Sequence, residues 1–399
     1  SWAAGPTGVP GGAPTGFRVY ISRNGYGFND YIEVAGAGTT SLVIPAAELD
    51  GNAYYFKVVA TNIGGESPGS ALAGARKNGA GGANPVLIVD GFDRFDRTQN
   101  VRYPYAFTGD GLVDRVWARA NNSFDYVVQF GEAIEAYDQS IGFDFVQNEA
   151  VIAGQVNLAD YQAIIWFSGE ESVANDTFNP TEQTLVTSYL SGGGKLFVSG
   201  AEIGFELESQ GAGVSFYNNT LKADYTADDG GSYTTSGVAG TIFDGIALTF
   251  DNGTLFYDVG TPDRIAAVGG SVVAMNYTSP GSGGAAIQYA HPSNGSRIVN
   301  FGFPFETITT AANRAAVIDR VFDFFGLAVP PPNADFNNDG TVDAADYTVW
   351  RDSLGTSVTP GEQGDADFDG QVDDDDYDIW KQQFGTSPGA GAAAGAGND

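Results

Sequence analysis

A repeat of 30 residues near the C-terminus constrains this chain more than any other feature. The first copy, residues 335–346, reads DFNNDGTVDAAD, and the second, residues 365–376, reads DADFDGQVDDDD. The same offset superposes a tyrosine, a tryptophan and a glycine that follow each copy. Two long matches in one register indicate a duplicated structural unit rather than an acidic tail with chance spacing.

Each copy has the spacing of a calcium-binding loop. Oxygens at positions 1, 3 and 5 converge on one cation, and glycine at position 6 permits the sharp turn. Position 7 supplies its carbonyl, position 9 acts through water, and position 12 closes the shell. Position 12 is Asp in both copies instead of the longer Glu, which predicts weaker affinity. The predicted ligands of two Ca²⁺ ions are Asp335, Asn337, Asp339, Thr341, Asp343 and Asp346, and Asp365, Asp367, Asp369, Gln371, Asp373 and Asp376.

The charge of the chain excludes several classes of partner. The chain has 49 acidic and 18 basic residues, a net charge of −31, so it repels the phosphate backbone of nucleic acids. Residues 333–386 alone hold 14 acidic and 2 basic side chains, so we expect this segment to unfold without cations. The sequence has no cysteine, which excludes thiol nucleophiles, and no apolar run long enough to predict a membrane span.

Residues 333–387 resemble the type I dockerin, a module of paired calcium loops and helices. The resemblance implies an extracellular or cell-surface protein whose module attaches to a cohesin. In the family, loop positions 10 and 11 often select the cohesin and are frequently hydroxyl residues. Here these positions are Ala344-Ala345 and Asp374-Asp375. An anchor to another surface partner and a stabilising terminal module are therefore kept as alternatives. A low-complexity tail, residues 388–399, follows the module.

The first segment, residues 1–80, predicts short strands and glycine-rich turns. Residues 17–21, 41–44 and 54–60 have the alternating pattern of half-buried strands. Trp2 with Pro6, the run at 15–20 and the turn at 65–67 resemble a fibronectin type III β-sandwich whose first strand and most of the second are missing. Trimming of the chain explains such a gap, and so does a strand donated by another chain.

The central segment, residues 85–329, predicts an α/β domain with a mainly parallel sheet. Apolar runs at 86–89, 163–167, 195–198 and 298–301 alternate with helical patterns near 123–137, between 180 and 192, and at 309–326. Residues 223–300 predict short strands and long loops. Glycine-rich residues 77–84 and the proline run at 330–332 are the predicted linkers on either side.

Polar residues follow the apolar runs, and parallel strands bring such residues to one edge of the sheet. Carboxylates there could form an acid–base pair, hold a divalent cation, or cap helices. The sharp turn after residue 198 places Ala201 at the expected nucleophile position, and a Ser199/His291/acid arrangement stays open from spacing alone. The candidate catalytic residues are Asp90, Glu170, Glu171, Ser199, Glu202, His291 and Glu306.

Five phrases of the central segment resemble a bacterial family of exported proteins. These proteins are labelled xanthan lyase, golvesin-like or N-acetylmuramoyl-L-alanine amidase. The phrases are LIVDGFD at 87–93, NEAVI at 148–152, GEES at 169–172, LFVSGAEIG at 196–204 and FGFPFETI at 301–308. The resemblance implies a flavodoxin-like fold of the class I glutamine-amidotransferase type. Those enzymes use Cys and His, and this chain lacks the Cys. The three modules together are similar to planctomycete secreted proteins.

These observations predict a secreted, calcium-binding, modular surface protein. We expect a structural or adhesive component of an extracellular matrix, surface layer or filament, with a non-catalytic α/β domain. Its partner would be a second copy, another surface protein or a polysaccharide. The alternative is a secreted hydrolase or lyase that acts on polysaccharide or peptidoglycan through the carboxylate-rich edge.

Overall fold

The structure is a computed structural model. It describes residues 1–2, 12–45, 48–49, 51–78, 84–94, 101–105, 111–115, 126–174, 176–278, 283–327, 333–356, 358, 363–366 and 371–387. The proline run at 330–332, most of the predicted linker at 77–84 and the tail at 388–399 lie outside the described residues.

The N-terminal segment forms a five-stranded antiparallel sheet. Its strands are β1 (Gly16–Ser22), β2 (Asp30–Ala35), β3 (Tyr54–Asn62), β4 (Gly65–Glu66) and β5 (Ala73–Ala75), in the order β2-β1-β3-β4, with β5 beside β3. Alternation places Phe17 and Val19 on an apolar face, while Arg18 and Glu33 form an ion pair on the other.

The strand predicted at 41–44 is wrong, because those residues form no strand. Their alternating pattern is that of a strand, but no ladder in the described part of the chain pairs with it. The residue just before this segment, Thr40, accepts a backbone hydrogen bond from Trp2 N–H (2.9 Å).

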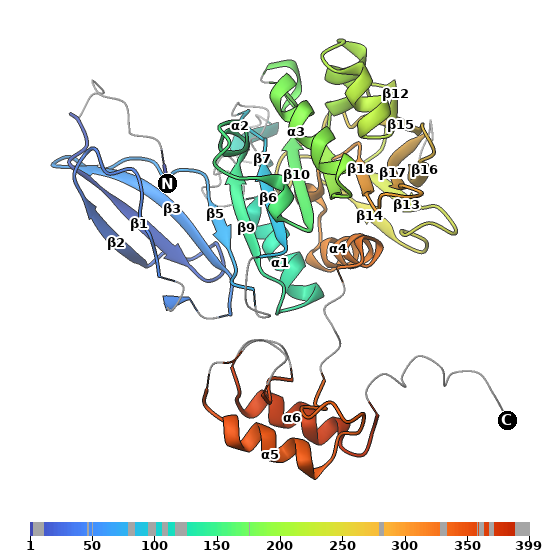
Figure 1. The fold of residues 1–399 in the computed structure, drawn as a ribbon. Coiled ribbons are helices and arrows are strands. Elements are labelled where there is room, and N and C mark those ends of the chain that lie inside the picture. The colour runs from blue at the N-terminus through green and yellow to red at the C-terminus, as the bar shows by residue number, and fades with distance from the viewer. Residues whose placement is uncertain are drawn as a thin grey trace.

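The central segment forms an 11-stranded mixed sheet (Figure 1). Its parallel half has the order β9 (Phe143–Gln147), β6 (Val86–Asp90), β10 (Ala163–Gly169), β11 (Lys195–Gly200) and β18 (Arg297–Phe301). The other half is antiparallel and consists of β12 (Ala223–Ala227), β13 (Thr234–Gly237), β14 (Ala247–Thr249), β15 (Arg264–Ala267), β16 (Val272–Tyr277) and β17 (Gly284–Ala290). The sheet is therefore half parallel and not mainly parallel, because residues 223–300 add six strands whose pairings are all antiparallel.

Successive residues of the parallel strands enter two separate cores, which explains their continuous apolar runs. Ile88 and Ile165 face the core beneath α1 (Val127–Tyr137) and α4 (Ala311–Phe325). Leu87 and Ile164 face the core beneath α3 (Pro180–Ser191). The sequence-predicted helices are confirmed within the described residues, and α3 begins as expected, with a capping box and a proline in its first turn.

Shorter elements complete the described part of the central segment. They are the hairpin β7 (Val101–Tyr105) and β8 (Gly111–Arg115), helix α2 (Asn148–Ile152), and the single-turn helices η3 (Leu158–Asp160), η4 (Ser172–Ala174), η5 (Phe205–Ser209), η6 (Phe216–Thr220) and η7 (Phe305–Thr307). No helix in the described residues is both long and apolar enough to cross a membrane.

The N-terminal sheet packs directly on the central domain. Tyr55 and Leu72 belong to the same buried core as α1. An antiparallel bridge between Arg76 and Phe143 also joins the chain after β5 to β9. Because apolar side chains of both sheets share one core, these two segments are not separated by solvent along this face.

The repeat forms a pair of similar helices, α5 (Ala344–Ser353) and α6 (Asp374–Gln383). Each begins with a capping box, made by Asp343 with Asp346 in α5 and by the equivalent residues in α6. Trp350 Nε1 donates to the Asp373 carbonyl (2.7 Å), and Trp380 Nε1 donates to the Asp343 carbonyl (2.9 Å). The two bonds are reciprocal, so the sequence repeat is also a structural repeat.

Candidate functional site

The first loop of the repeat curls as a calcium loop requires. Asp335 accepts hydrogen bonds from the backbone of Asp339 (3.0 Å) and Gly340 (2.8 Å). Gly340 has φ +91°, a conformation that favours glycine, at the position where the loop turns sharply. Buried Asp346 accepts from the backbone of Asn337 (3.1 Å) and Asp343 (2.8 Å), so it closes the loop.

The second loop repeats this closure where it is described. Asp376 accepts from the backbone of Ala366 (2.7 Å) and Asp373 (2.8 Å). The predicted ligands Asp367 and Asp369 lie outside the described residues. Carboxylate, amide and carbonyl oxygens are the donors that Ca²⁺ prefers, so the residues present fit that ion. Asp343 and Asp373 cap their helices through side-chain bonds to the backbone of Ala345 and Asp375.

A second group of polar residues lies at the carboxyl edge of the parallel strands, and most of its acids are held by the protein's own chain. Asp90 accepts from the Phe92 backbone (3.0 Å) and from Gln147 Nε2 (3.0 Å). Glu171 accepts from the Arg94 backbone (2.9 Å). Glu306 is fully buried and accepts from the Tyr257 hydroxyl (2.6 Å). These bonds indicate structural roles for the three acids.

Glu170 and Glu202 follow the neighbouring strands β10 and β11, and the charge of Glu202 acts on Glu170. Glu170 follows β10 and accepts a hydrogen bond from the Gly260 backbone (3.0 Å). Glu202 follows β11 and accepts from the Thr261 hydroxyl, so both acids contact one loop of the antiparallel half. Glu202 directly precedes a short helix that begins at Ile203, as the capping hypothesis expects, but its carboxylate also accepts a hydrogen bond from a different loop.

Burial gives these acids unusual proton affinities. It raises the pKa of Glu170 to about 8, and the negative charge of Glu202 acts in the same direction. Burial also raises the pKa of Glu306 to about 7 and holds the pKa of Asp90 well above its usual value. Glu170 therefore retains its proton at neutral pH, as a general acid must.

The turn after β11 is strained at Glu202, and not at Ala201 as the sequence predicts. Glu202 has φ +62°, an unfavourable conformation for any residue with a Cβ, and a short helix begins at Ile203. Ala201 is buried, and its backbone donates to the Gly169 carbonyl (2.7 Å). The residue at the sharp strand-to-helix turn is therefore Glu202, which carries a carboxylate. The sequence spacing predicts this turn position one residue too early, at Ala201.

The hypothetical Ser199/His291 pair is contradicted by the register of the sheet. His291 follows Ala290, which pairs with Arg297, and Arg297 pairs with Lys195 at the start of β11. Ser199 lies four residues beyond Lys195 on the same strand, which places it about 13 Å from the end of the sheet where His291 lies. The imidazole Nδ1 of His291 instead accepts from the backbones of the two loop residues Ser293 and Asn294 (3.2 and 3.1 Å).

Within the described residues, in the first calcium loop as at this edge, no group of three or more acidic or histidine side chains is placed to hold a metal ion. The cation site that the sequence analysis considered at this edge therefore has no ligand set there. Sequence reasoning missed Gly260, Thr261 and Tyr257, the partners of the edge acids. They lie far along the chain from those acids in a loop without a recognisable motif.

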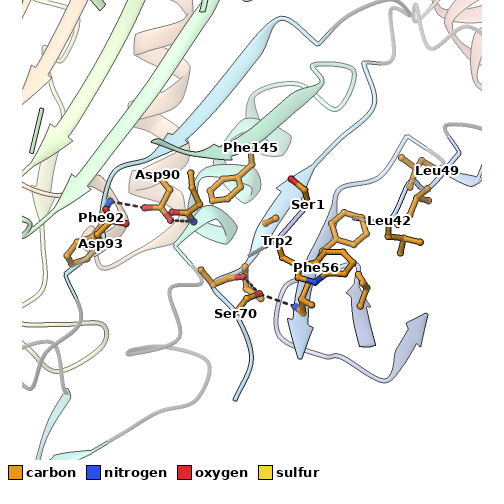
Figure 2. A pocket seen from close by; sticks show the side chains of 17 residues that line it. Ser1, Trp2, Leu42, Leu49, Phe56, Ser70, Asp90, Phe92, Asp93 and Phe145 are labelled. Atoms are coloured by element: carbon orange, nitrogen blue, oxygen red, sulfur yellow. Dashed lines mark hydrogen bonds between the residues drawn. The ribbon is translucent and has the colours of Figure 1, made fainter. Parts of the chain in front are cut away.

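A cleft opens beside the same edge, between the N-terminal sheet and β9 (Figure 2). Its volume is about 580 Å³. Asp90, Asp93 and Phe145 come from the central domain, whereas Trp2 and Phe56 come from the N-terminal segment. Apolar side chains make up most of its lining.

Comparisons with known proteins identify the class of the repeat. Residues 333–385 match the family model of the dockerin type I domain. A solved type II cohesin-dockerin domain from Bacteroides cellolosolvens is similar at 33% identity, with a TM-score of 0.13. That match covers 14% of this chain and 90% of the other. The family match identifies residues 333–385 as a dockerin type I domain, a class that generally binds calcium and cohesin partners in modular extracellular or cell-surface proteins.

The comparisons say little about the rest of the chain. An exo-β-1,4-mannosidase from an Opitutaceae bacterium matches with 10% identity and a TM-score of 0.34. The match covers 61% of this chain and 35% of the mannosidase. Such a likeness carries no argument about fold or activity. No curated protein matches the chain. The resemblances of residues 1–80 and 85–329 and the planctomycete similarity stay predictions.

Proposed function

We propose that this chain is an attached component of an extracellular surface assembly, in which the dockerin module binds two Ca²⁺ ions and docks on a cohesin-type protein. The N-terminal sheet and the α/β domain are then the structural or adhesive part that the module attaches. The duplicated loop carries this proposal, because the backbone of each copy holds the aspartate at position 12 in the same way in the described residues.

A structural role for the α/β domain is supported by its own contacts. Asp90, Glu171 and Glu306 satisfy backbone or side-chain donors inside the fold. Ser199 is buried, and the single histidine of the chain lies at the opposite edge.

Calorimetric titration of the calcium-free protein with Ca²⁺ tests the attachment. We expect two ions per chain, and one ion in each of the variants Asp335→Ala and Asp365→Ala. A panel of immobilised cohesins should retain the protein in Ca²⁺ and release it in chelator. Asp352→Ala, an exposed position outside the loops, is the control and should bind like the wild type. A calcium-loaded, folded module that no cohesin retains would contradict this docking mode and leave self-association as the structural alternative.

A second candidate function is favoured by the Glu170–Glu202 pair. A buried acid with a pKa of about 8 beside a less buried carboxylate is an arrangement suited to general acid and general base. The candidate is a hydrolase or lyase that acts on polysaccharide or peptidoglycan at the carboxyl edge of the sheet.

Glu170→Gln and Glu202→Gln, assayed on both substrate classes, test this second function. Each should lower activity by about 100-fold or more, while the control Glu149→Gln, an exposed acid at the same edge, should not. Equal activity of all three variants, or no activity of the wild type on either substrate class, would rule out this second function.

A further inference from the structure

A second cavity lies at the amino edge of the parallel strands, opposite the edge that holds Glu170 and Glu202. Its volume is about 460 Å³, which falls within the range of ligand pockets, roughly 300–1,000 Å³. It lies between the end of α3, the starts of β10 and β11, and the segment before β10 that contains η3. Its described lining lies entirely within residues 151–195 of the central domain.

The floor of this cavity is apolar and is held in place by packing and hydrogen bonds. Val151, Leu158 and Tyr189 are almost fully buried there and belong to the core beneath α3. The Tyr189 hydroxyl lies within hydrogen-bond distance of the carbonyls of Gln162 and Lys195 (3.2 Å each), and it accepts from the Lys195 backbone (3.1 Å). These bonds join α3 to the starts of both strands, so the shape of the cavity is fixed by the fold.

The walls above this floor keep apolar surface partly open. Val156, Tyr161 and Leu185 line the cavity and are only partly buried against the core. The Tyr161 hydroxyl donates to Asp144 (2.8 Å), which fixes the orientation of the ring. Apolar surface left open to water gains free energy when a ligand covers it. The walls therefore favour a ligand with a compact hydrocarbon face.

Polar side chains stand beside this apolar surface. Gln162 and Ser188 line the cavity and are exposed, and neither side chain makes a hydrogen bond to a described residue. Ser191, on the same helix, instead bonds back to the Thr187 carbonyl (2.7 Å). An amide and a hydroxyl each offer both a donor and an acceptor. Lys195 also lines the cavity, at the start of β11.

We propose that this cavity binds a short stretch of a saccharide chain, with the apolar face of a sugar ring against Tyr161 and Leu185 and its hydroxyls at Gln162 and Ser188. A sugar ring combines a C–H face with hydroxyls that donate and accept, so it matches both kinds of surface in the cavity. An adhesive role for this site rests on the proposed surface attachment. The binding itself does not, because the lining residues belong neither to a calcium loop nor to the candidate catalytic pair.

Calorimetric titration of the full chain with cellotriose, triacetylchitotriose and trigalacturonate tests the proposal. We expect at least one trimer to bind once per chain with a Kd of about 1 mM or tighter. A neutral trimer should bind equally well in Ca²⁺ and in chelator, whereas cohesin binding should not, so the two proposals can fail separately. Tighter binding of trigalacturonate that Lys195→Met removes would assign an acidic saccharide. No saturable binding of any trimer up to about 10 mM would overturn the proposal.

Adjacent residues of α3 supply a matched pair of variants. Ser188 lines the cavity, whereas Thr187 is also exposed and does not. Ser188→Trp fills the cavity and should weaken binding by about tenfold or more, and Thr187→Trp should leave the Kd unchanged. Circular dichroism and thermal unfolding establish that each variant is folded. Unchanged affinity of folded Ser188→Trp would place the bound saccharide elsewhere and overturn the proposal.

A second pair of variants tests the polar contact without adding bulk. Gln162→Ala removes one amide and should weaken binding by about two- to tenfold. Gln210→Ala removes an exposed glutamine outside the cavity and should bind like the wild type. Equal loss of affinity in both variants would contradict a contact at Gln162.

Discussion

Glu170 shows how its surroundings set the charge of one residue. The side chain is almost fully buried after β10, accepts from Gly260, and experiences the negative charges of Glu202 and Asp258 with Arg94 as the nearby cation. Its pKa is about 8 in the folded protein and close to 4.5 in an unfolded chain. Between these values the folded state holds a proton that the unfolded state has released.

Stability therefore falls as the pH rises from about 4.5 to about 8, since the folded state binds more protons there. We predict that Glu170→Gln, which mimics the neutral acid, flattens this fall. Relative to the wild type the variant should gain at most about 5 kcal/mol at pH 8, and little at pH 4. Urea unfolding at several pH values measures the slope. Glu182, Glu206 and Glu306, whose pKa values burial raises to about 7, leave a residual slope of the same sign. An unchanged slope would show that Glu170 is not responsible.

Glu202 is a second residue whose role depends on its backbone. Its φ of +62° costs a side-chain-bearing residue about 1 kcal/mol, and Lys222 has a similar φ of +63°. We predict that Glu202→Gly and Lys222→Gly each change stability by less than about 1 kcal/mol, because relief of strain offsets the extra entropy of glycine. Thermal unfolding measures this. Only Glu202→Gly should abolish a carboxylate-dependent activity, if the wild type has one.

At the scale of elements, α5 and α6 depend on their loops more than on their own sequence. Each has ten residues, which is short for an isolated helix, and the two pack through a small core with Val342 and Ala366. Fourteen acidic side chains in residues 333–386 repel one another unless cations offset them.

Calcium removal should therefore unfold this module before the rest of the chain. In excess chelator we expect proteolysis to cleave within residues 333–387 and to leave the central domain intact. In Ca²⁺ the same digestion should spare both. Mass spectrometry of the fragments gives the cleavage sites. A module that keeps its helical signal and its protease resistance in chelator would contradict the prediction.

Four strands of the parallel half, β6, β10, β11 and β18, could be predicted because their apolar runs are continuous and end in polar residues. Strand β9 was missed, because Asp144 interrupts its apolar run. The strand at 41–44 could not, because alternation describes a preference, whereas a strand also needs a partner ladder. The antiparallel half of the sheet was predicted only as short strands and loops, since pairing direction depends on which distant segments meet.

At the scale of the whole molecule, the N-terminal sheet and the central domain share a core through Tyr55, which packs with α1. We predict that Tyr55→Ala costs about 3–5 kcal/mol and destabilises both segments together. Tyr31→Ala, on the same sheet but 43% exposed, should cost less than about 1 kcal/mol. Hydrogen exchange followed by mass spectrometry reports both segments separately. Exchange that rises only in residues 16–75 would show that the two segments unfold independently.

What the sequence by itself determined is local: the calcium loops, the helix caps, the buried strand runs and the acidic charge. Each of these features depends on residues a few positions apart in the chain, so it can be predicted from sequence spacing alone. Only the tertiary structure decided which acids meet. The bond from Gly260 to Glu170 spans 90 residues, and the bond from Thr261 to Glu202 spans 59. It also placed His291 at the edge opposite Ser199 and opened the cleft beside β9, because strand order and register are set by long-range packing.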